Sequence, residues 1–128
     1  MDYPALQGRL RSFAAARDWQ SRHTPKNLAT ALTVQSAGLL EMFQWTTSSE
    51  SRGVVRDPAH KERVAHGIAD VLLCLLQMAD QAGVDLPEAV DDRDELLGGG
   101  AGESLARDGL VGLDFPHVVA DGQVQAQE

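Results

Sequence analysis

The chain has 128 residues, of which 43% are hydrophobic and 23% charged, and its formal charge is −8 because 19 acidic residues outnumber 11 basic ones. This length and composition predict one small soluble domain with a core of its own. The acidic balance, with a pI of about 4.8, argues against a nucleic-acid partner, because such binding depends on clustered lysines and arginines.

No membrane or secretory segment is predicted. Residues 1–4 lack a basic region followed by an apolar run, and the longest apolar stretch, residues 71–76, is too short to span a bilayer. The single cysteine, Cys74, lies among leucines and is predicted to be a buried, unreactive thiol. We expect a cytoplasmic protein, and the abundance of Ala, Gly, Asp and Val is typical of a high-GC bacterial genome.

The first half of the chain predicts two helices and a loop. Apolar residues recur at helical spacing over residues 6–19 and again from about residue 25 to residue 45. The apolar stripe of the second stretch is interrupted only by Gln35. Residues 46–56 are rich in serine and other polar residues, which predicts a loop.

A third helix is predicted to begin at Asp57-Pro58, because an aspartate is a good N-cap and proline is favoured at the first helical position. It is expected to end at Gly83. Its predicted buried stripe consists of Val64, Ile68, Val71, Leu75 and Met78.

A fourth helix should begin near Asp85 and stop at the glycines of residues 98–100. Four amphipathic helices with mostly short connections predict an all-α four-helix bundle over residues 1–100. Residues 101–128 are predicted to be a partly disordered C-terminal extension, with a short apolar patch that lies back on the domain or on a partner chain.

Several strings keep one register along the chain: FAAARDW at residues 13–19, HTPKNL at 23–28, LLEMFQW at 39–45 and VDLPEAV at 84–90. Together they resemble the MazG-like all-α nucleotide pyrophosphohydrolases, in the dCTP-pyrophosphatase branch. The resemblance implies a bundle that assembles as a homodimer or homotetramer with each site shared between chains. The implied reaction is hydrolysis of a nucleoside triphosphate to a monophosphate and pyrophosphate.

In that family, magnesium is held by a Glu-x-x-Glu pair on the second helix and a Glu-x-x-Asp pair on the third, because Mg²⁺ prefers oxygen ligands. Carried onto this sequence, these positions fall on Gln35, Gly38, Gly67 and Asp70, so one of the four carboxylates remains. Glu41, one turn beyond Gly38, cannot rebuild the cluster alone. We therefore expect no metal site and no cofactor; magnesium belongs only to the alternative interpretation of the function.

The two glycines leave two interpretations open. A glycine inside a helix costs about 0.5–1 kcal/mol relative to alanine, so it requires a compensating reason. Gly38 and Gly67 either enlarge a pocket between the second and third predicted helices or allow those helices to close together. A larger pocket would admit a larger or less charged ligand.

The resemblance also implies a base-recognition wall, formed by Trp19, His23, Lys26, Asn27 and Trp45. An aromatic ring can stack on a nucleobase or another flat ring. The alternative is that each tryptophan anchors a core or an interface. The histidine either contacts a ligand as donor, acid or base, or satisfies a local backbone group.

Three further residues are candidates for ligand contact. His66 lies four residues before Asp70, a spacing that allows an acid/base pair on one helix face, although a solvated His66 is the simpler interpretation. If Gln35 is buried, it requires a hydrogen-bond partner such as Asp70, Glu41 or a ligand. Cys74 falls where the family has a tyrosine.

Three functions follow from these residues. The preferred hypothesis is a repurposed protein that binds or transforms a nucleotide-like or aromatic small molecule without metal, using Asp70, Glu41 or His23 for acid/base chemistry. The first alternative is a residual nucleoside triphosphate pyrophosphohydrolase. The second alternative is a non-enzymatic subunit whose surface pairs with another protein.

Overall fold

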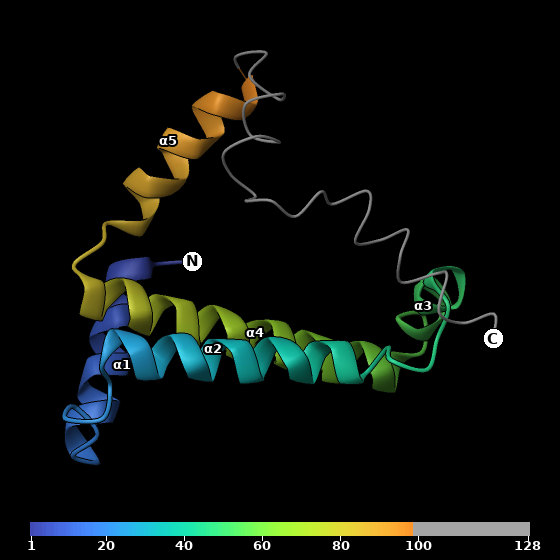
Figure 1. The fold of residues 1–128 in the computed structure, drawn as a ribbon, viewed down its shortest axis with the longest axis horizontal. Coiled ribbons are helices and arrows are strands. Elements are labelled where there is room, and N and C mark those ends of the chain that lie inside the picture. Colours follow the sequence, from blue (N-terminus) through green and yellow to red (C-terminus); the bar gives the residue numbers. More distant parts are fainter. Residues whose placement is uncertain (99–128) are drawn as a thin grey trace. The chain divides into compact units, whose positions relative to one another are not determined.

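The computed structural model describes residues 1–98, with side chains up to Arg93, and this part of the chain is entirely helical outside its turns. The predicted extension over residues 101–128 lies outside the described residues. In chain order the helices are α1 (Tyr3–Ala16), α2 (Pro25–Glu41), α3 (Ser48–Val54), α4 (Pro58–Ala82) and α5 (Leu86–Gly98) (Figure 1). The all-α fold class predicted from the sequence is confirmed.

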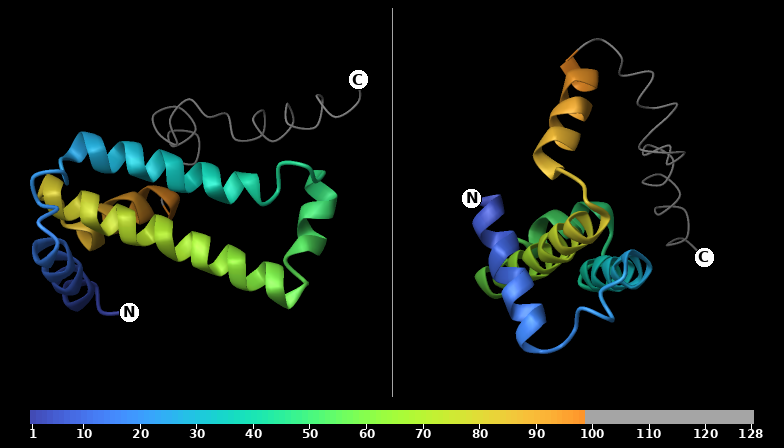
Figure 2. Two further views of the ribbon diagram at one scale, coloured as in Figure 1. Left: turned by 90° about the horizontal axis from the view of Figure 1, so that it is seen from below. Right: turned by 90° about the vertical axis from the view of Figure 1, so that its left-hand side faces the viewer.

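The chain divides into two units, one over residues 1–85 and one that begins at Leu86 and contains α5. In the first unit, α2 and α4 run side by side in opposite directions and form the most extensive contact, while α1 packs on α4 (Figure 2). The short α3 joins the end of α2 to the start of α4. The pairing of α2 with α4 is therefore the main feature of this unit.

The predicted helix starts are confirmed by their caps. The Thr24 hydroxyl accepts a hydrogen bond from the Asn27 amide before α2, and the Asp57 carboxylate accepts one from the Ala59 amide before α4. Each cap is followed by a proline. Proline has no backbone N–H, and no hydrogen bond is lost because an amide at the first helical position has no acceptor within the helix. Gly83 ends α4 in the left-handed region, with φ of 67°, a conformation that glycine adopts without strain.

The loop predicted over residues 46–56 is wrong, because residues Ser48–Val54 form α3. The physical reason is a capping box: the Thr47 hydroxyl accepts from the Glu50 amide at 3.1 Å, and the Glu50 carboxylate accepts from the Thr47 amide at 3.2 Å. The second predicted helix is also shorter than expected, since α2 ends at Glu41 and turns occupy the residues up to 45.

The core of the first unit is small and lies where α1, α2 and α4 meet. Its buried side chains are Ala14, Leu28, Cys74, Leu76 and Ala79. The prediction that Ile68 and Leu75 are buried is wrong, because their side chains are 56% and 39% exposed. The reason is that the main contacts of α4, which are with α2 and α1, leave much of the Ile68 and Leu75 side chains uncovered.

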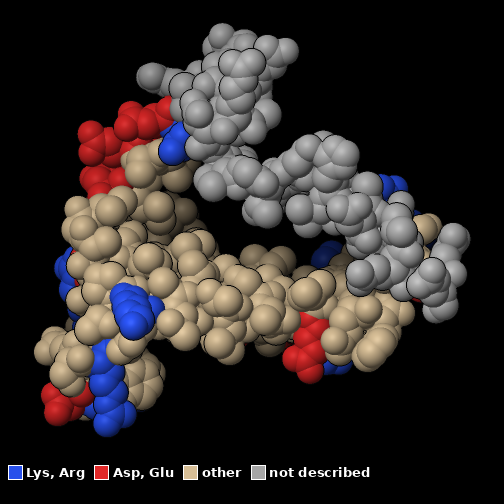
Figure 3. Space-filling view, viewed as in Figure 1, with Lys and Arg blue, Asp and Glu red and all other residues tan. Residues whose placement is uncertain are grey.

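The outer side of α2 is almost free of charge. Its only charged residues, Lys26 and Glu41, lie in its first and last turns, and Figure 3 shows an uncharged surface along this helix. Among the described helices, none is by itself long and apolar enough to cross a membrane. Helix α4 and the start of α5 meet those criteria only when they are taken together across the break between them.

Candidate functional site

Two cavities lie next to each other along the groove between α2 and α4. The first, which we call the His23 cavity, has a volume of about 360 Å³. It is lined by Arg22, His23, Asn27, Leu28, Ala31, Gln35, Asp70, Leu73, Cys74 and Gln77. The sequence predicted four of its polar side chains as ligand contacts, namely His23, Asn27, Gln35 and Asp70.

The second cavity, which we call the Arg63 cavity, has a volume of about 260 Å³. It is lined by Gln35, Gly38, Leu39, Met42, Arg63, His66, Gly67 and Asp70. Gln35 and Asp70 line both cavities, so these two side chains lie at the boundary between them.

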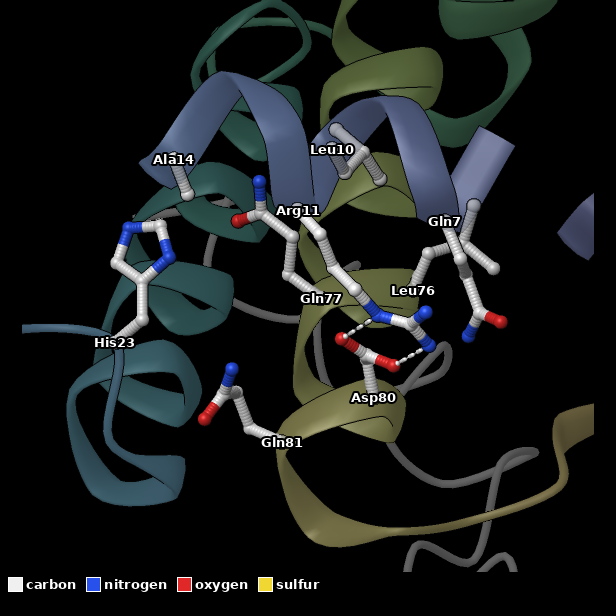
Figure 4. A pocket seen from close by; sticks show the side chains of 9 residues that line it. All are labelled: Gln7, Leu10, Arg11, Ala14, His23, Leu76, Gln77, Asp80 and Gln81. Carbon is white, nitrogen blue, oxygen red and sulfur yellow. Dashed lines mark hydrogen bonds and ion pairs between the residues drawn. The ribbon is translucent and has the colours of Figure 1, made fainter. Parts of the chain in front are cut away.

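A third cavity is much smaller and lies between α1 and α4, as Figure 4 shows. Its volume of about 20 Å³ fits a single water molecule. The Arg11 guanidinium faces the Asp80 carboxylate there through two contacts, one of 2.8 Å from Nε to Oδ2. The hydrogen bond from Arg11, with its positive charge, lowers the pKa of Asp80. This pair ties α1 to α4.

His23 connects the small cavity with the groove, because it lines both. The Trp19 ring lies 5.9 Å from the His23 ring and makes an edge contact of 5.6 Å with Phe13, both distances between centroids. The Arg17 guanidinium lies over the Phe13 ring, with its central carbon 3.4 Å from the ring centroid. The Trp19 ring therefore lies beside the imidazole that lines the His23 cavity.

The two tryptophans are not brought together within one chain. Trp19 precedes α2 and Trp45 follows it, and a helix of 17 residues spans about 25 Å. Trp45 is 90% exposed. A flat ring held beside Trp19 therefore does not reach Trp45 of the same chain.

Lys26 and Glu41 are both exposed and line neither cavity. The Asn27 side-chain amide donates to the Arg22 carbonyl at 3.0 Å, which fixes the turn before α2, and Asn27 also lines the His23 cavity. Of the predicted base-recognition wall, His23 and Asn27 thus lie in the groove and Trp19 supports it.

The cysteine is buried as predicted. The Cys74 thiol donates to the Leu28 carbonyl at 3.5 Å, and burial raises the pKa of Cys74 because it disfavours the thiolate. An unreactive thiol follows, which contributes packing between α2 and α4 and a weakly polar wall to the His23 cavity.

The structure decides between the alternatives for Gln35 and for His66 with Asp70, and it agrees with the simpler interpretation of a solvated His66. Gln35 is exposed to the groove, so the partner that a buried amide would require is not needed. His66 and Asp70 are exposed as well, and no hydrogen bond or ion pair joins them. Both side chains face the Arg63 cavity independently.

The two glycines have different surroundings, so each of the two open interpretations holds at one position. A Cβ at Gly67 would lie 2.7 Å from Cδ2 of Leu39 and 3.3 Å from Cε of Met42, which means that the helices close together there. A Cβ at Gly38 would meet nothing within 4 Å. Gly38 therefore widens the Arg63 cavity, and Gly67 permits the close packing that forms its floor.

The described residues that line the two cavities offer few ligands for a magnesium ion. Asp70 is the only carboxylate that lines either cavity, and the described part of the chain contains no group of three or more His, Cys, Asp or Glu side chains that could hold a metal. Mg²⁺ requires several oxygen ligands in octahedral geometry. The other side-chain oxygens of the two linings belong to the amides of Asn27, Gln35 and Gln77, so each cavity offers a single charged ligand.

Arg63 was missed by the sequence analysis, which followed the carboxylate positions alone. The signal was available, because Arg63, His66, Gly67 and Asp70 recur at spacings of three, four and seven residues on a predicted helix. Such residues share one face. Arg22 and Gln77 were missed as well, and nothing in their spacing distinguished them.

Comparisons with known proteins agree with this fold. The sequence profile of the MazG-like family matches residues 31–95, about half of the chain. The chain belongs to the MazG-like family. A crystal structure of a pyrophosphatase from Archaeoglobus fulgidus is similar to this MazG-like protein at 42% identity with a TM-score of 0.67, covering 72% of this chain and 84% of the other.

Two mammalian relatives are similar over a shorter part of their length. Human and mouse dCTP pyrophosphatase 1 are 40% and 38% identical to this MazG-like protein over 78 residues. These residues make up 61% of this chain and 46% of each relative. This MazG-like protein therefore spans about half the length of the curated relatives that it matches.

Proposed function

We propose that this MazG-like protein binds a nucleotide in the groove between α2 and α4. The observation that carries the proposal is the pair of adjacent cavities that share Gln35 and Asp70. The His23 cavity, at about 360 Å³, falls in the range of roughly 300–1,000 Å³ that is usual for small-molecule sites. A nucleoside held there has its phosphate end directed along the groove toward the Arg63 cavity.

The polar side chains of the His23 cavity suit the edge of a nucleobase and a sugar. The Asn27 carbonyl oxygen accepts, the Gln35 amide donates and accepts, and the Asp70 carboxylate accepts from an amine or a hydroxyl. Apolar contact comes from side chains such as Leu28 and Leu73. This mixture of a few polar groups on an apolar wall is typical of a site that orients a small ligand.

Hydrolysis of a nucleoside triphosphate to a monophosphate and pyrophosphate is the second candidate, and the comparisons favour it over metal-free acid/base chemistry. The mammalian relatives are named dCTP pyrophosphatase 1, and the archaeal structure is named a pyrophosphatase. The small number of carboxylates disfavours magnesium-dependent hydrolysis, because Asp70 is the only described carboxylate that lines the two cavities. Metal-free chemistry would use Asp70 or His23, since Glu41 lies outside both cavities.

The proposed assembly is a homodimer or homotetramer that buries the outer side of α2. Val34 and Leu40 are 65% and 68% exposed there, and no charged residue lies between Lys26 and Glu41. Removing such apolar area from water favours association. Light scattering on the purified chain tests this assembly, and a monomer at micromolar concentration would contradict it.

Calorimetric titration with deoxycytidine, dCMP and dCTP tests nucleotide binding. We expect Gln35→Ala to weaken nucleotide binding about fivefold to tenfold, the loss of one or two hydrogen bonds. Gln44→Ala removes the same amide from an exposed position outside both cavities and should change nothing. Absence of binding by all three ligands would contradict the proposed function and favour an interaction subunit.

Release of pyrophosphate from dCTP in the presence of Mg²⁺ distinguishes the two candidates. A wild-type rate above background that Asp70→Ala abolishes would establish hydrolysis. Binding without pyrophosphate release would establish a nucleotide-binding protein. The same titrations in EDTA show whether the ligand requires the metal.

A further inference from the structure

The lining of the Arg63 cavity includes an arginine that forms no ion pair within the described residues. Arg63 and His66 are three residues apart on α4 and line the cavity together. The described ion pairs join Arg11 with Asp80 and His60 with Asp57, and neither Arg63 nor His66 takes part in one. The Arg63 guanidinium has five N–H donors and no ion-pair partner among the described side chains, so it is available to bind an oxyanion.

The carboxylate of the cavity lies at its other end. Asp70 follows Arg63 by seven residues, which is about 10 Å along the axis of α4, and it faces the boundary with the His23 cavity. Arg63 and Asp70 line the same cavity without forming an ion pair. The cavity is therefore polarised, with its positive end farthest from the His23 cavity.

The shape of the cavity leaves room beside these donors. Gly38 presents open space where a side chain would project, and Leu39 and Met42 form an apolar floor over Gly67. An apolar floor lowers the local dielectric and strengthens the attraction between a guanidinium and an anion. The Gln35 amide adds one more hydrogen-bond donor at the boundary.

We infer that the Arg63 cavity binds a phosphate or pyrophosphate group directly, through Arg63 and His66, without a bridging metal ion. Positive charge from the protein replaces the cation that a single carboxylate cannot hold. The inference rests on the proposed function insofar as the phosphates are those of a nucleotide in the His23 cavity. Free inorganic phosphate or pyrophosphate offers the same chemistry.

Titration of the full chain with inorganic pyrophosphate in EDTA tests the inference. We expect binding without metal, weakened by Arg63→Gln roughly tenfold to a hundredfold because charge-assisted hydrogen bonds are lost. His66→Ala should weaken it about threefold, the value of one ordinary hydrogen bond. Arg9→Gln removes a guanidinium from an exposed position on α1 and should leave the affinity unchanged.

Titrations of the same variants with deoxycytidine and dCTP separate the inference from the proposed function. Arg63→Gln should weaken dCTP and leave deoxycytidine unaffected. If pyrophosphate binding depends on Arg63 and deoxycytidine does not bind, the proposed nucleotide-binding function is refuted. The Arg63 cavity is then a site for free phosphate or pyrophosphate. Pyrophosphate that fails to bind in EDTA, or that binds Arg63→Gln and wild type equally, would overturn the inference even if deoxycytidine binds.

Discussion

The two ends of the α2–α4 groove are built differently. At the α1 end, where α1 meets α2 and α4, side chains are buried and the Arg11 guanidinium is held by Asp80. At the Arg63 end, the guanidinium has no partner among the described residues, no side chain is buried, and glycines stand on both helices. The same residue type thus contributes to structure at one end and is available to a ligand at the other.

The largest expected effect at the α1 end is that of Leu76→Ala. Leu76 is fully buried, and removing such a side chain costs the lost transfer free energy plus a cavity, about 3 kcal/mol in the free energy of unfolding. Ile68→Ala deletes as many carbon atoms at a position on α4 that is 56% exposed and should stay within about 0.5 kcal/mol. Urea unfolding followed by circular dichroism measures both, and equal losses would contradict the position of the core.

The two glycines give an intermediate effect with different outcomes. Gly38→Ala should stabilise the protein by about 0.5–1 kcal/mol, because alanine favours the helix and its Cβ meets open space. Gly67→Ala gains the same propensity but displaces Leu39 and Met42, so we expect it to be less stable than Gly38→Ala by about 1 kcal/mol. Thermal unfolding compares them, and equal stabilisation would show that the helices do not close over Gly67.

The smallest effect concerns the ion pair between Arg11 and Asp80. Because the hydrogen bond from Arg11 lowers the pKa of Asp80, the folded carboxylate holds its charge to a lower pH than the unfolded one. This stabilisation is present at neutral pH and is lost as the pH falls through the folded pKa. Asp80→Asn should lower Tm by about 2–5 °C at pH 7, and the difference should close below about pH 4. A difference that grows in acid would contradict this sign.

Much of the fold was predictable because its signals are local. Thr24-Pro25 and Asp57-Pro58 mark helix starts through caps that involve neighbouring residues, and Gly83 marks a helix end. The short α3 has a local signal as well, in the capping box of Thr47 and Glu50, but the serines around it favoured a loop. The starts of α2 and α4 can therefore be predicted from a few adjacent residues. The short α3 is harder to predict, because its local signal is a single pair of capping hydrogen bonds.

The site was predictable only in part. His23, Asn27, Gln35 and Asp70 were identified through their register in the MazG-like family, and they meet in one cavity. The exposure of Ile68 could not be predicted, because periodicity shows that a helix has an apolar side and does not show whether another element covers it.

The sequence by itself determined four of the five described helices, the caps that start α2 and α4, the family and the presence of one carboxylate at positions where the family resemblance implies four. These properties depend on neighbouring residues and on register along the chain. Only the tertiary structure decided that Gly67 closes the groove while Gly38 opens it, and that Arg11 is paired while Arg63 is not. Those differences arise from the packing of α2 against α4 and of α1 against α4, contacts between residues that are far apart in the chain.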